Sequence, residues 1–282
     1  MNMKTKKILK YFFVAAIIGV FFAACKKKDA TALVDSDTSG ASDNALAEGT
    51  FSDVSHISDQ AAGGVLTSYL SIYNNNSANR GVNTFPSITA DSANHKFTIN
   101  FGTVPYLCHD GRYRSGVITV TYTGVHYYDV NGTITIAFAS YTVNGNAVSG
   151  TYSIVNNGIV NGSPTYTIDV NGTIVKANSA GTIAWVSHRV RSWTAGTATP
   201  TDYTDDVYSI TGTASGTQSN GEAFTENCSN LMVHLNCSYI ESGQLNITPA
   251  GKATRYIDFG PDGTCDSKAT VTISGISYTF TM

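Results

Sequence analysis

From Asn94 to the end of the chain, apolar and polar residues alternate with a period of two, and this alternation constrains the fold more than any other feature. In residues 116–124, for example, Ile118, Val120 and Tyr122 alternate mainly with threonines. Successive side chains leave a strand on opposite faces, so the pattern predicts antiparallel strands with one buried face and one threonine-rich face in water. No stretch after residue 75 has helical periodicity, which predicts a mainly β domain.

Asn-Gly pairs punctuate these alternating runs and predict where the strands turn. They are Asn131-Gly132, Asn144-Gly145, Asn157-Gly158, Asn161-Gly162, Asn171-Gly172 and Asn220-Gly221. Both central residues of a type I′ turn need positive φ, which Asn and Gly adopt at low cost, so each pair predicts a tight hairpin. The result is an antiparallel β-meander of about a dozen strands. The sequence leaves open a barrel-like closure, a sandwich of two sheets, or one long twisted sheet.

Residues 45–75 have a different periodicity, which predicts one N-terminal amphipathic helix interrupted near Gly63-Gly64. Its apolar residues recur every three or four positions: Phe51, Val54, Ile57, Ala61 and Val65. We expect this stripe to cover the sheet and Glu48, Asp53 and Asp59 to point away from it. The following residues, 76–282, are predicted to form a single β domain.

The N-terminus has the parts of an export signal. Four lysines precede an apolar run from Tyr11 to Ala24, and small residues stand just before Cys25. The apolar run is shorter than the roughly 20 residues that a membrane-spanning helix needs. The pattern resembles a bacterial lipoprotein signal peptide at residues 1–24, which implies that Cys25 is acylated and becomes the mature N-terminus. Acyl chains would hold the protein on a membrane, so we expect an outer-membrane lipoprotein that faces the periplasm or the cell surface.

The composition of the mature chain bears on its partners. Residues 25–44 contain almost no large apolar side chain, so we expect the lipidated cysteine to be followed by a flexible tether. Removal of residues 1–24 with their four lysines changes the formal net charge from −3 to −7. Nucleic-acid binding needs clustered Lys and Arg, so no nucleic-acid partner is predicted.

Four further cysteines, at positions 108, 228, 237 and 265, allow three pairings in an exported chain. An Ile-x-Phe-Gly segment precedes both Cys108 and Cys265 at a similar distance. We therefore predict a Cys108–Cys265 disulfide and, as the remaining pair, Cys228–Cys237. Four free, buried thiols are the alternative.

Candidate catalytic and metal-binding residues do not form a recognisable set. The pair His109-Asp110 could orient a general base, but no nucleophile motif accompanies it, and a solvated loop is favoured. Two acidic groups, at positions 258, 262 and 266 and at positions 202, 205 and 206, lack the spacing of a calcium loop. The histidines lack a zinc-binding spacing. We predict no enzyme, no metal site and no cofactor.

Trp185, Arg189, Arg191 and Trp193 lie on one face of a single predicted strand, together with Ser187. If that face is exposed, two indole rings flanking two guanidinium groups could stack on sugar rings and bind their hydroxyls. If it is the core face, the tryptophans are packing residues and the arginines lie at the rim, which we favour. These residues are the binding candidates that the sequence offers.

Turn-rich segments are spread through the mature chain, at residues 110–124, 141–146, 193–196, 206–212, 247–249 and 263–266. They resemble a family of uncharacterised envelope lipoproteins from Bacteroidota. The resemblance implies a lipid anchor, an envelope location and a β fold, and it transfers no activity or catalytic residue.

Three functions are consistent with this sequence. The first is a non-enzymatic structural or binding module of the cell envelope, whose partner is a glycan or an envelope protein. The second is a small-molecule carrier with an apolar cavity inside the sheet, plugged by the N-terminal helix. The third is a hydrolase of envelope polymers, which the absence of a catalytic motif disfavours.

Overall fold

A computed structural model describes residues 35–63, 86–108, 110–199, 202–261 and 263–282. The chain divides into two compact units, residues 1–35 and residues 36–282, and the second unit contains the described elements. Cys25 and residues 26–34 of the predicted tether lie outside the described residues, as do residues 64–75 of the predicted helix. Residues 39–44 were predicted to belong to the flexible tether, but they are helical.

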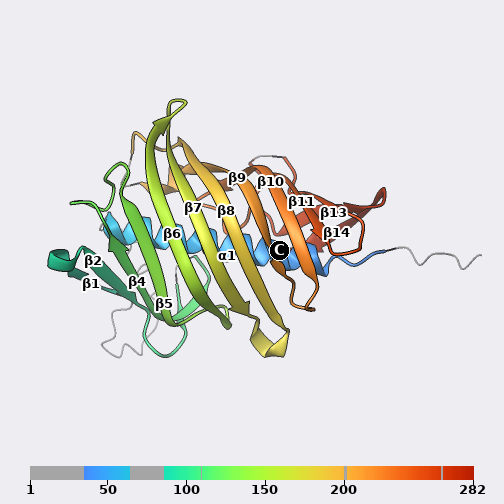
Figure 1. Cartoon of the computed structure of the whole chain (residues 1–282), viewed down its shortest axis with the longest axis horizontal. Coiled ribbons are helices and arrows are strands. Elements are labelled where there is room, and N and C mark those ends of the chain that lie inside the picture. The colour runs from blue at the N-terminus through green and yellow to red at the C-terminus, as the bar shows by residue number, and fades with distance from the viewer. Residues whose placement is uncertain (1–34, 64–85, 109, 200–201, 262) are drawn as a thin grey trace, which may run out of the picture. The chain divides into compact units, whose positions relative to one another are not determined.

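Fourteen strands in the described part of the chain form one antiparallel sheet (Figure 1). They are β1 Ser87–Asp91, β2 Lys96–Asn100, β3 Tyr106–Leu107, β4 Tyr113–Tyr122, β5 Thr133–Val143, β6 Asn146–Val160, β7 Ser163–Val175, β8 Thr182–Ala195, β9 Val207–Thr217, β10 Ala223–His234, β11 Ser242–Pro249, β12 Arg255–Asp258, β13 Lys268–Ile273 and β14 Ile276–Thr281. Each strand pairs with its neighbour in sequence, except that β2 pairs with β4 and the two-residue β3 pairs with β4 alone. The prediction of a mainly β antiparallel meander is confirmed.

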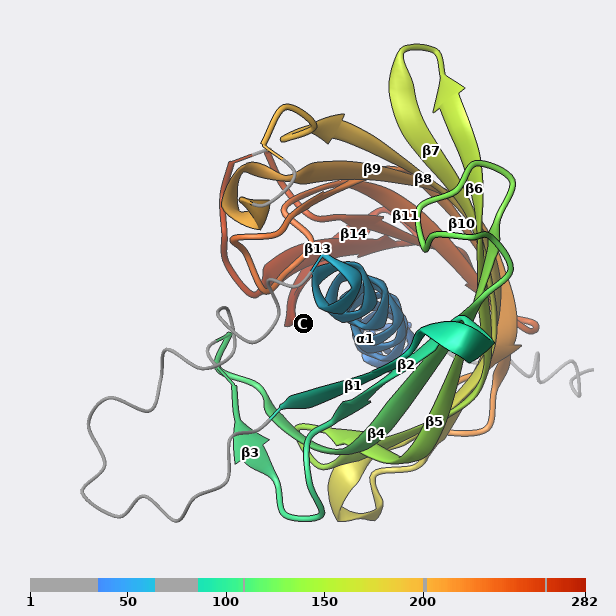
Figure 2. The same ribbon diagram turned by 90° about the vertical axis from the view of Figure 1, so that its left-hand side faces the viewer.

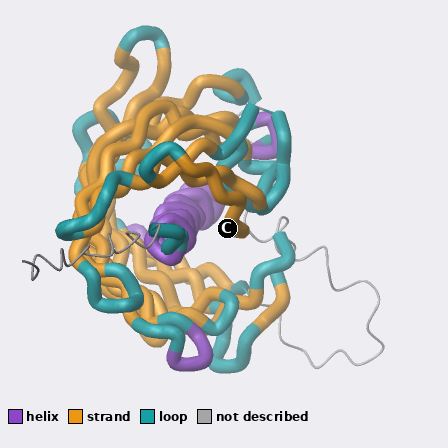
Figure 3. Tube along the Cα trace, turned by 90° about the vertical axis from the view of Figure 1, so that its right-hand side faces the viewer, coloured by secondary structure: helices purple, strands orange, loops and turns teal. Residues whose placement is uncertain are grey.

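The sheet is not closed. β1 and β14 are its two ends, and the described pairings do not join them. Of the arrangements that the sequence left open, the structure has one continuous sheet, which curls so strongly that it surrounds the helix on its concave side (Figures 2 and 3).

Three of the six Asn-Gly pairs form the predicted hairpins, between β5 and β6, between β6 and β7, and between β9 and β10. At the first two, Asn144 and Asn161 have φ of 51° and 53°, and the following glycines also have positive φ. This is the backbone conformation that a type I′ turn requires.

The other three pairs are not hairpin turns. Asn131-Gly132 ends the long β4–β5 loop, and Asn157-Gly158 lies within β6 at an irregularity in its pairing with β7. Asn171-Gly172 lies in the middle of β7, where Gly172 pairs with Gly150 of β6. A Cβ atom on Gly172 would be 2.2 Å from Cζ of Phe51. The glycine therefore allows the aromatic ring to pack against the strand, and it does not form a turn.

The helix α1 spans Ser39–Ala62 and lies within the curl of the sheet (Figure 2). It begins six residues earlier than predicted, and Gly63 caps its C-terminus. Seventeen of its 24 residues are buried, because the sheet packs around most of its circumference. Glu48 and Asp53 are among them, so the prediction that these carboxylates point away from the sheet was wrong. None of the described helices is both long and apolar enough to cross a bilayer.

The core lies between α1 and the concave face of the sheet. Phe51 of α1 stacks on Trp185 of β8 with ring centroids 5.3 Å apart and an interplanar angle of 2°. Tyr152 of β6 donates a hydrogen bond of 3.0 Å to the carbonyl of Phe51. Val54 and Ile57 are also buried here. The helix is therefore an integral part of the core rather than a plug at one end.

Candidate functional site

Four carboxylates of α1 form ion pairs with cations of the sheet, and the helix itself carries no Lys or Arg. The pairs are Asp43 with Lys176 at 2.6 Å, Glu48 with Arg189 at 2.7 Å, Asp53 with Arg114 at 2.8 Å and Asp59 with Arg191 at 3.0 Å. The arginine side chains in these pairs are 0–3% exposed, so their charges are partnered where water is excluded, whereas Lys176 and Asp59 are 25% and 22% exposed. Such pairs fix position and register more than they stabilise the fold.

Arg189 is shared by two carboxylates. Its Nε and Nη2 donate to Oε2 of Glu48 at 3.0 and 2.7 Å, and Nη2 also donates to Glu226 of β10. Burial alone would lower the pKa of Arg189, but the two carboxylates outweigh it and raise that pKa further. Burial raises the pKa of Glu226 to about 7, although Arg189 opposes this shift.

The predicted sugar-binding platform on β8 is not exposed. Trp185, Arg189 and Arg191 are 1–2% exposed and face α1, where the Nε1 of Trp185 donates to Asn44 at 3.2 Å. Trp193 is half-buried, stacks on Tyr208 and donates to Asp206 at 3.1 Å. The core-face alternative is therefore correct for the tryptophans, but the arginines are interior ion-pair residues rather than rim residues.

A cleft of about 660 Å³ runs along one side of α1. The β3–β4 turn and the β5–β6 hairpin line it from one part of the sheet, and the β10–β11 connection lines it from another. Leu46, Gly49, Asp53, His56 and Gln60 line it from α1 at spacings of three and four residues. One helical face therefore forms the floor of the cleft.

Arg112 spans the cleft from wall to floor. Its Nη1 donates to Asp53 of α1 at 2.8 Å and to Asp110 at 3.2 Å, and its Nη2 donates to the carbonyl of Ser238 at 2.8 Å. Arg114 also binds Asp110, at 2.8 Å. Burial would raise the pKa of Asp110, but the two arginines outweigh it and lower that pKa. Asp53 and Asp110 are therefore both ion-paired with guanidinium groups.

Uncharged polar groups complete the floor. His56 is 9% exposed and stacks on Tyr208, and burial together with nearby Arg191 holds its pKa well below the usual range, so the imidazole is neutral. Nε2 of His56 and Oε1 of Gln60 are shielded from solvent and have no protein hydrogen-bond partner among the described residues. At Gly49, a Cβ atom would meet no atom within 4 Å, so the cleft is open there.

The sequence analysis missed this face of α1. Gly49 interrupts an otherwise helical stretch, and glycine in a helix interior costs roughly 0.5–1 kcal/mol relative to alanine. That local cost is a signal that could have pointed to a cleft. His109, the other half of the predicted His-Asp pair, lies outside the described residues.

Cys237 and Cys265 form a disulfide, so both predicted pairings were wrong. Cys237 lies in the β10–β11 connection and Cys265 in the exposed loop before β13. Cys108 and Cys228 are free and buried. Cys228 lies within β10 and faces the core, which keeps its sulfur away from the surface loops, and burial raises the pKa of both thiols.

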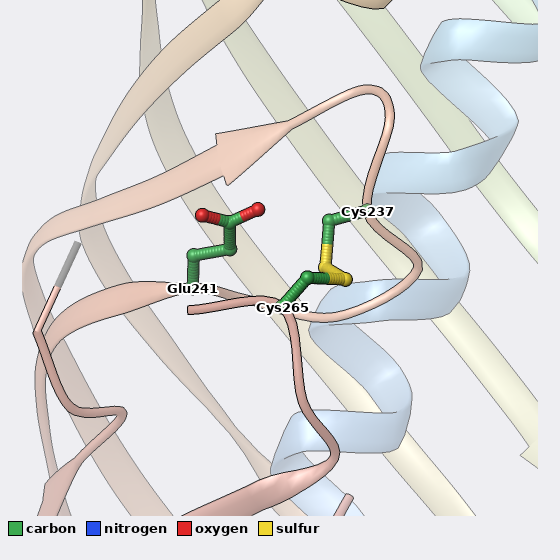
Figure 4. Close-up of side chains that lie close together, drawn as sticks. All are labelled: Cys237, Glu241 and Cys265. Atoms are coloured by element: carbon green, nitrogen blue, oxygen red, sulfur yellow. A yellow bond between two sulfur atoms is a disulfide. The ribbon is translucent and has the colours of Figure 1, made fainter. Parts of the chain in front are cut away.

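Glu241 lies beside this disulfide (Figure 4), and its carboxylate is within 4.8 Å of both sulfur atoms. Cysteine binds metals as a thiolate, and here the two sulfurs are bonded to each other. The three residues therefore do not offer a set of metal ligands in the oxidised chain.

The acidic groups that the sequence singled out bind nearby backbone and side-chain donors. Asp202 accepts from the backbone of Thr204 at 3.0 Å, and Asp205 accepts from the hydroxyl of Thr199 at 2.7 Å. Asp258 and Asp266 each accept from a backbone N–H two residues later. Asp262 lies outside the described residues.

No protein-family model matches the chain, and searches of curated proteins and of solved structures find no match. The resemblance to Bacteroidota envelope lipoproteins therefore stays a prediction.

Proposed function

We propose that this chain is a lipid-anchored, non-enzymatic binding module of the cell envelope, and that the cleft along α1 takes an uncharged, hydroxyl-rich ligand such as a short oligosaccharide. The observation that carries the proposal is the lining of the cleft, where the charged groups are partnered within the protein and the free polar groups are neutral.

The charges argue against an ionic ligand. Asp53 and Asp110 bind Arg112 and Arg114, and Glu48 binds Arg189. An anionic or cationic ligand would have to displace one partner of a largely buried pair, which is costly. The uncharged side chains of Asn236 and Tyr239, which line the cleft and are exposed, can instead exchange hydrogen bonds with hydroxyl groups.

The size and polarity of the cleft also fit a saccharide. Its 660 Å³ lies within the range of small-molecule sites, about 300–1,000 Å³. Asn144, Asn236 and Ser238 line it together with Tyr203 and Tyr239, and these side chains offer hydroxyl and amide groups beside aromatic rings. Aromatic faces and convergent hydrogen-bonding groups are the features that recognise sugar rings.

The same lining disfavours the other two functions. A carrier of apolar molecules needs a continuous apolar cavity, but α1 fills the concave side of the sheet and polar groups line the remaining space. A hydrolase needs a free carboxylate or nucleophile, but the carboxylates here are ion-paired. Burial raises the pKa of the nearby Cys108 thiol, which keeps it protonated and unreactive.

The test is binding of neutral, anionic and cationic oligosaccharides to the full chain in detergent micelles, measured by titration calorimetry after a glycan-array screen. Gly49→Leu should fill the cleft and abolish binding without unfolding the protein, because nothing lies within 4 Å of the added Cβ. Gly49→Ala is the matched control, since it changes the same position but leaves most of the cleft open.

The proposal predicts that neutral oligosaccharides bind to wild type and Gly49→Ala but at least tenfold more weakly to Gly49→Leu. Binding of an apolar fluorescent probe alone, with no saccharide bound, would support the carrier instead. Saccharide binding that is unchanged in Gly49→Leu would place the site elsewhere and overturn the proposal.

A further inference from the structure

The hairpin between β6 and β7 projects beyond the rest of the sheet (Figures 1 and 2). The described pairing of β6 with β5 ends at Val155, and that of β7 with β8 begins at Thr165. Beyond these positions the two strands pair only with each other, as at Ile159 and Pro164. The end of the hairpin is therefore a narrow ribbon of two strands.

Five large apolar residues are exposed on this ribbon and on the neighbouring β4–β5 loop, and together they form an apolar tip. They are Val125, Tyr128, Val130, Ile159 and Val160, which are 43–73% exposed. The loop is fixed to the base of the hairpin, because the N–H of Asn131 donates to the carbonyl of Asn156 at 2.7 Å. Val130 also lies directly beside the hairpin, since a Cβ atom on Gly158 would be 3.1 Å from its Cγ1. Single exposed apolar residues are ordinary, whereas a cluster of them marks a contact surface.

The apolar tip carries little charge. Residues 155–168 contain no Lys, Arg, Asp or Glu, and the β4–β5 loop contributes His126 and Asp129, which lie 3.5 Å apart. The hydroxyl of Tyr128 already donates to the carbonyl of Asp59 at 2.8 Å, and the ribbon pairs its own backbone. Transfer of the tip to an apolar phase would therefore leave few polar groups without partners.

The chain is long enough to bring this tip and the predicted lipid anchor to the same bilayer. The helix α1 has 24 residues and is therefore about 36 Å long. It begins at Ser39, and near its other end Asp59 accepts hydrogen bonds from Tyr127 and Tyr128 of the β4–β5 loop. The 14 positions between Cys25 and Ser39 can extend to about 46–50 Å, which exceeds the length of the helix.

We propose that the apolar tip inserts into the surface of the bilayer that holds the acylated Cys25 and so forms a second membrane contact. This inference rests on the lipid anchor of the proposed function. A fluid bilayer adapts to a projecting, uncharged ribbon, whereas a protein partner would have to provide a matching concave surface. The anchor keeps the tip near the membrane at a high effective concentration, so a contact that is weak by itself becomes populated.

The experiment places a nitroxide spin label on the full, lipidated chain in phosphatidylcholine nanodiscs. Ile159→Cys carries the label on the hairpin, and Val130→Cys carries it on the β4–β5 loop. Val186→Cys is the matched control, because Val186 is also an exposed valine of the sheet but lies in the middle of β8. The two free cysteines of the described residues are buried and therefore compete little for the label.

Collisions of the label with oxygen, which partitions into lipid, and with a water-soluble nickel complex report its surroundings. We expect the ratio of oxygen to nickel collisions to be at least about threefold higher at positions 159 and 130 than at position 186, because the tip lies in lipid.

The other outcomes separate the docking from the anchor. Frequent nickel collisions at position 159, in a chain that stays on the nanodiscs, would overturn the docking and leave the anchor intact. Few collisions of either kind would mean that a second copy of the chain covers the tip, which would also overturn it. A chain that does not stay on the nanodiscs would refute the anchor and the docking together. Saccharide binding in the cleft is measured separately and does not depend on these results.

Discussion

Glu226 lies on β10 with a fully buried side chain, and it shares the Arg189 guanidinium with Glu48. Burial raises its pKa to about 7 from the ordinary 4.5. In this pH range the folded state binds a proton that the unfolded state has already released. The free energy of unfolding therefore falls as the pH rises from about 4.5 to 7, by at most about 3 kcal/mol.

Glu226→Gln keeps a hydrogen-bond acceptor beside Arg189 and removes this titration. We expect the variant to match wild type at pH 4.5 and to exceed it by up to about 3 kcal/mol at pH 8, as measured by urea unfolding at both pH values. Glu222→Gln, at the residue directly before β10 and in a solvent-accessible ion pair with Lys252, is the control and should leave the pH profile unchanged. A wild-type profile that is flat between pH 4.5 and 7 would contradict this account.

Gly172 illustrates a second effect of a single residue. Its Cβ position is 2.2 Å from the ring of Phe51, which is held by its stacking on Trp185. Gly172→Ala should therefore cost about 1–3 kcal/mol through overpacking, despite the ordinary strand backbone. The measurement is a double-mutant cycle with Phe51→Leu, whose smaller side chain should relieve the clash and recover at least half of the cost. Additive effects of the two substitutions would show that the ring does not restrict this position.

These residues mark the limit of local sequence signals. Asn171-Gly172 has the same letters as Asn144-Gly145, but one pair lies under a ring from a distant helix and the other forms a turn. Similarly, the alternation on β8 correctly places Trp185, Arg189 and Arg191 on one face. It does not show the helix carboxylates that allow those arginines to be buried, Glu48 at 141 residues from Arg189 and Asp59 at 132 residues from Arg191.

At the scale of elements, α1 and β8 are joined by charge as well as by apolar packing. Arg189→Met would leave Glu48 and Glu226 without their shared partner inside the protein, and breaking a buried pair in this way costs about 3–5 kcal/mol. The control is His188→Ala, the adjacent residue on β8, whose exposed pair with Asp169 should contribute less than about 1 kcal/mol. Urea unfolding of both variants at pH 8 makes the comparison, and equal losses would contradict the interior role of Arg189.

The sequence predicts where these strands and the helix lie along the chain better than it predicts which of their residues are buried. Period-two alternation locates most strands because the sheet has one wet and one dry face. The amphipathic pattern of residues 45–75 also locates a helix, but the stripe of Phe51, Val54 and Ile57 describes only part of its buried surface. Because the sheet curls around the helix, it also buries polar residues of the helix. The sequence of the helix alone does not indicate that a sheet surrounds it.

At the scale of the whole molecule, the sheet depends on α1 for both its core and its counter-charges. The concave face carries the buried arginines 114, 189 and 191, whose carboxylate partners on the helix are Asp53, Glu48 and Asp59. A sheet without the helix would expose its apolar face to water and leave these arginines without those partners. The sheet is also not closed, so no ring of strand pairing holds its curvature in place of the helix.

A chain that contains residues 86–282 alone should therefore lose cooperative thermal unfolding and its near-ultraviolet circular dichroism signal. A chain that starts at residue 35 should keep both, because it retains α1 and every described contact. Addition of a peptide spanning residues 35–63 to the shorter chain should restore part of the signal, since Phe51 and the four carboxylates of α1 would again meet the sheet. Cooperative unfolding of residues 86–282 at the Tm of the longer chain would show that the sheet is stable without its helix, and the account of α1 as the core element would then be wrong.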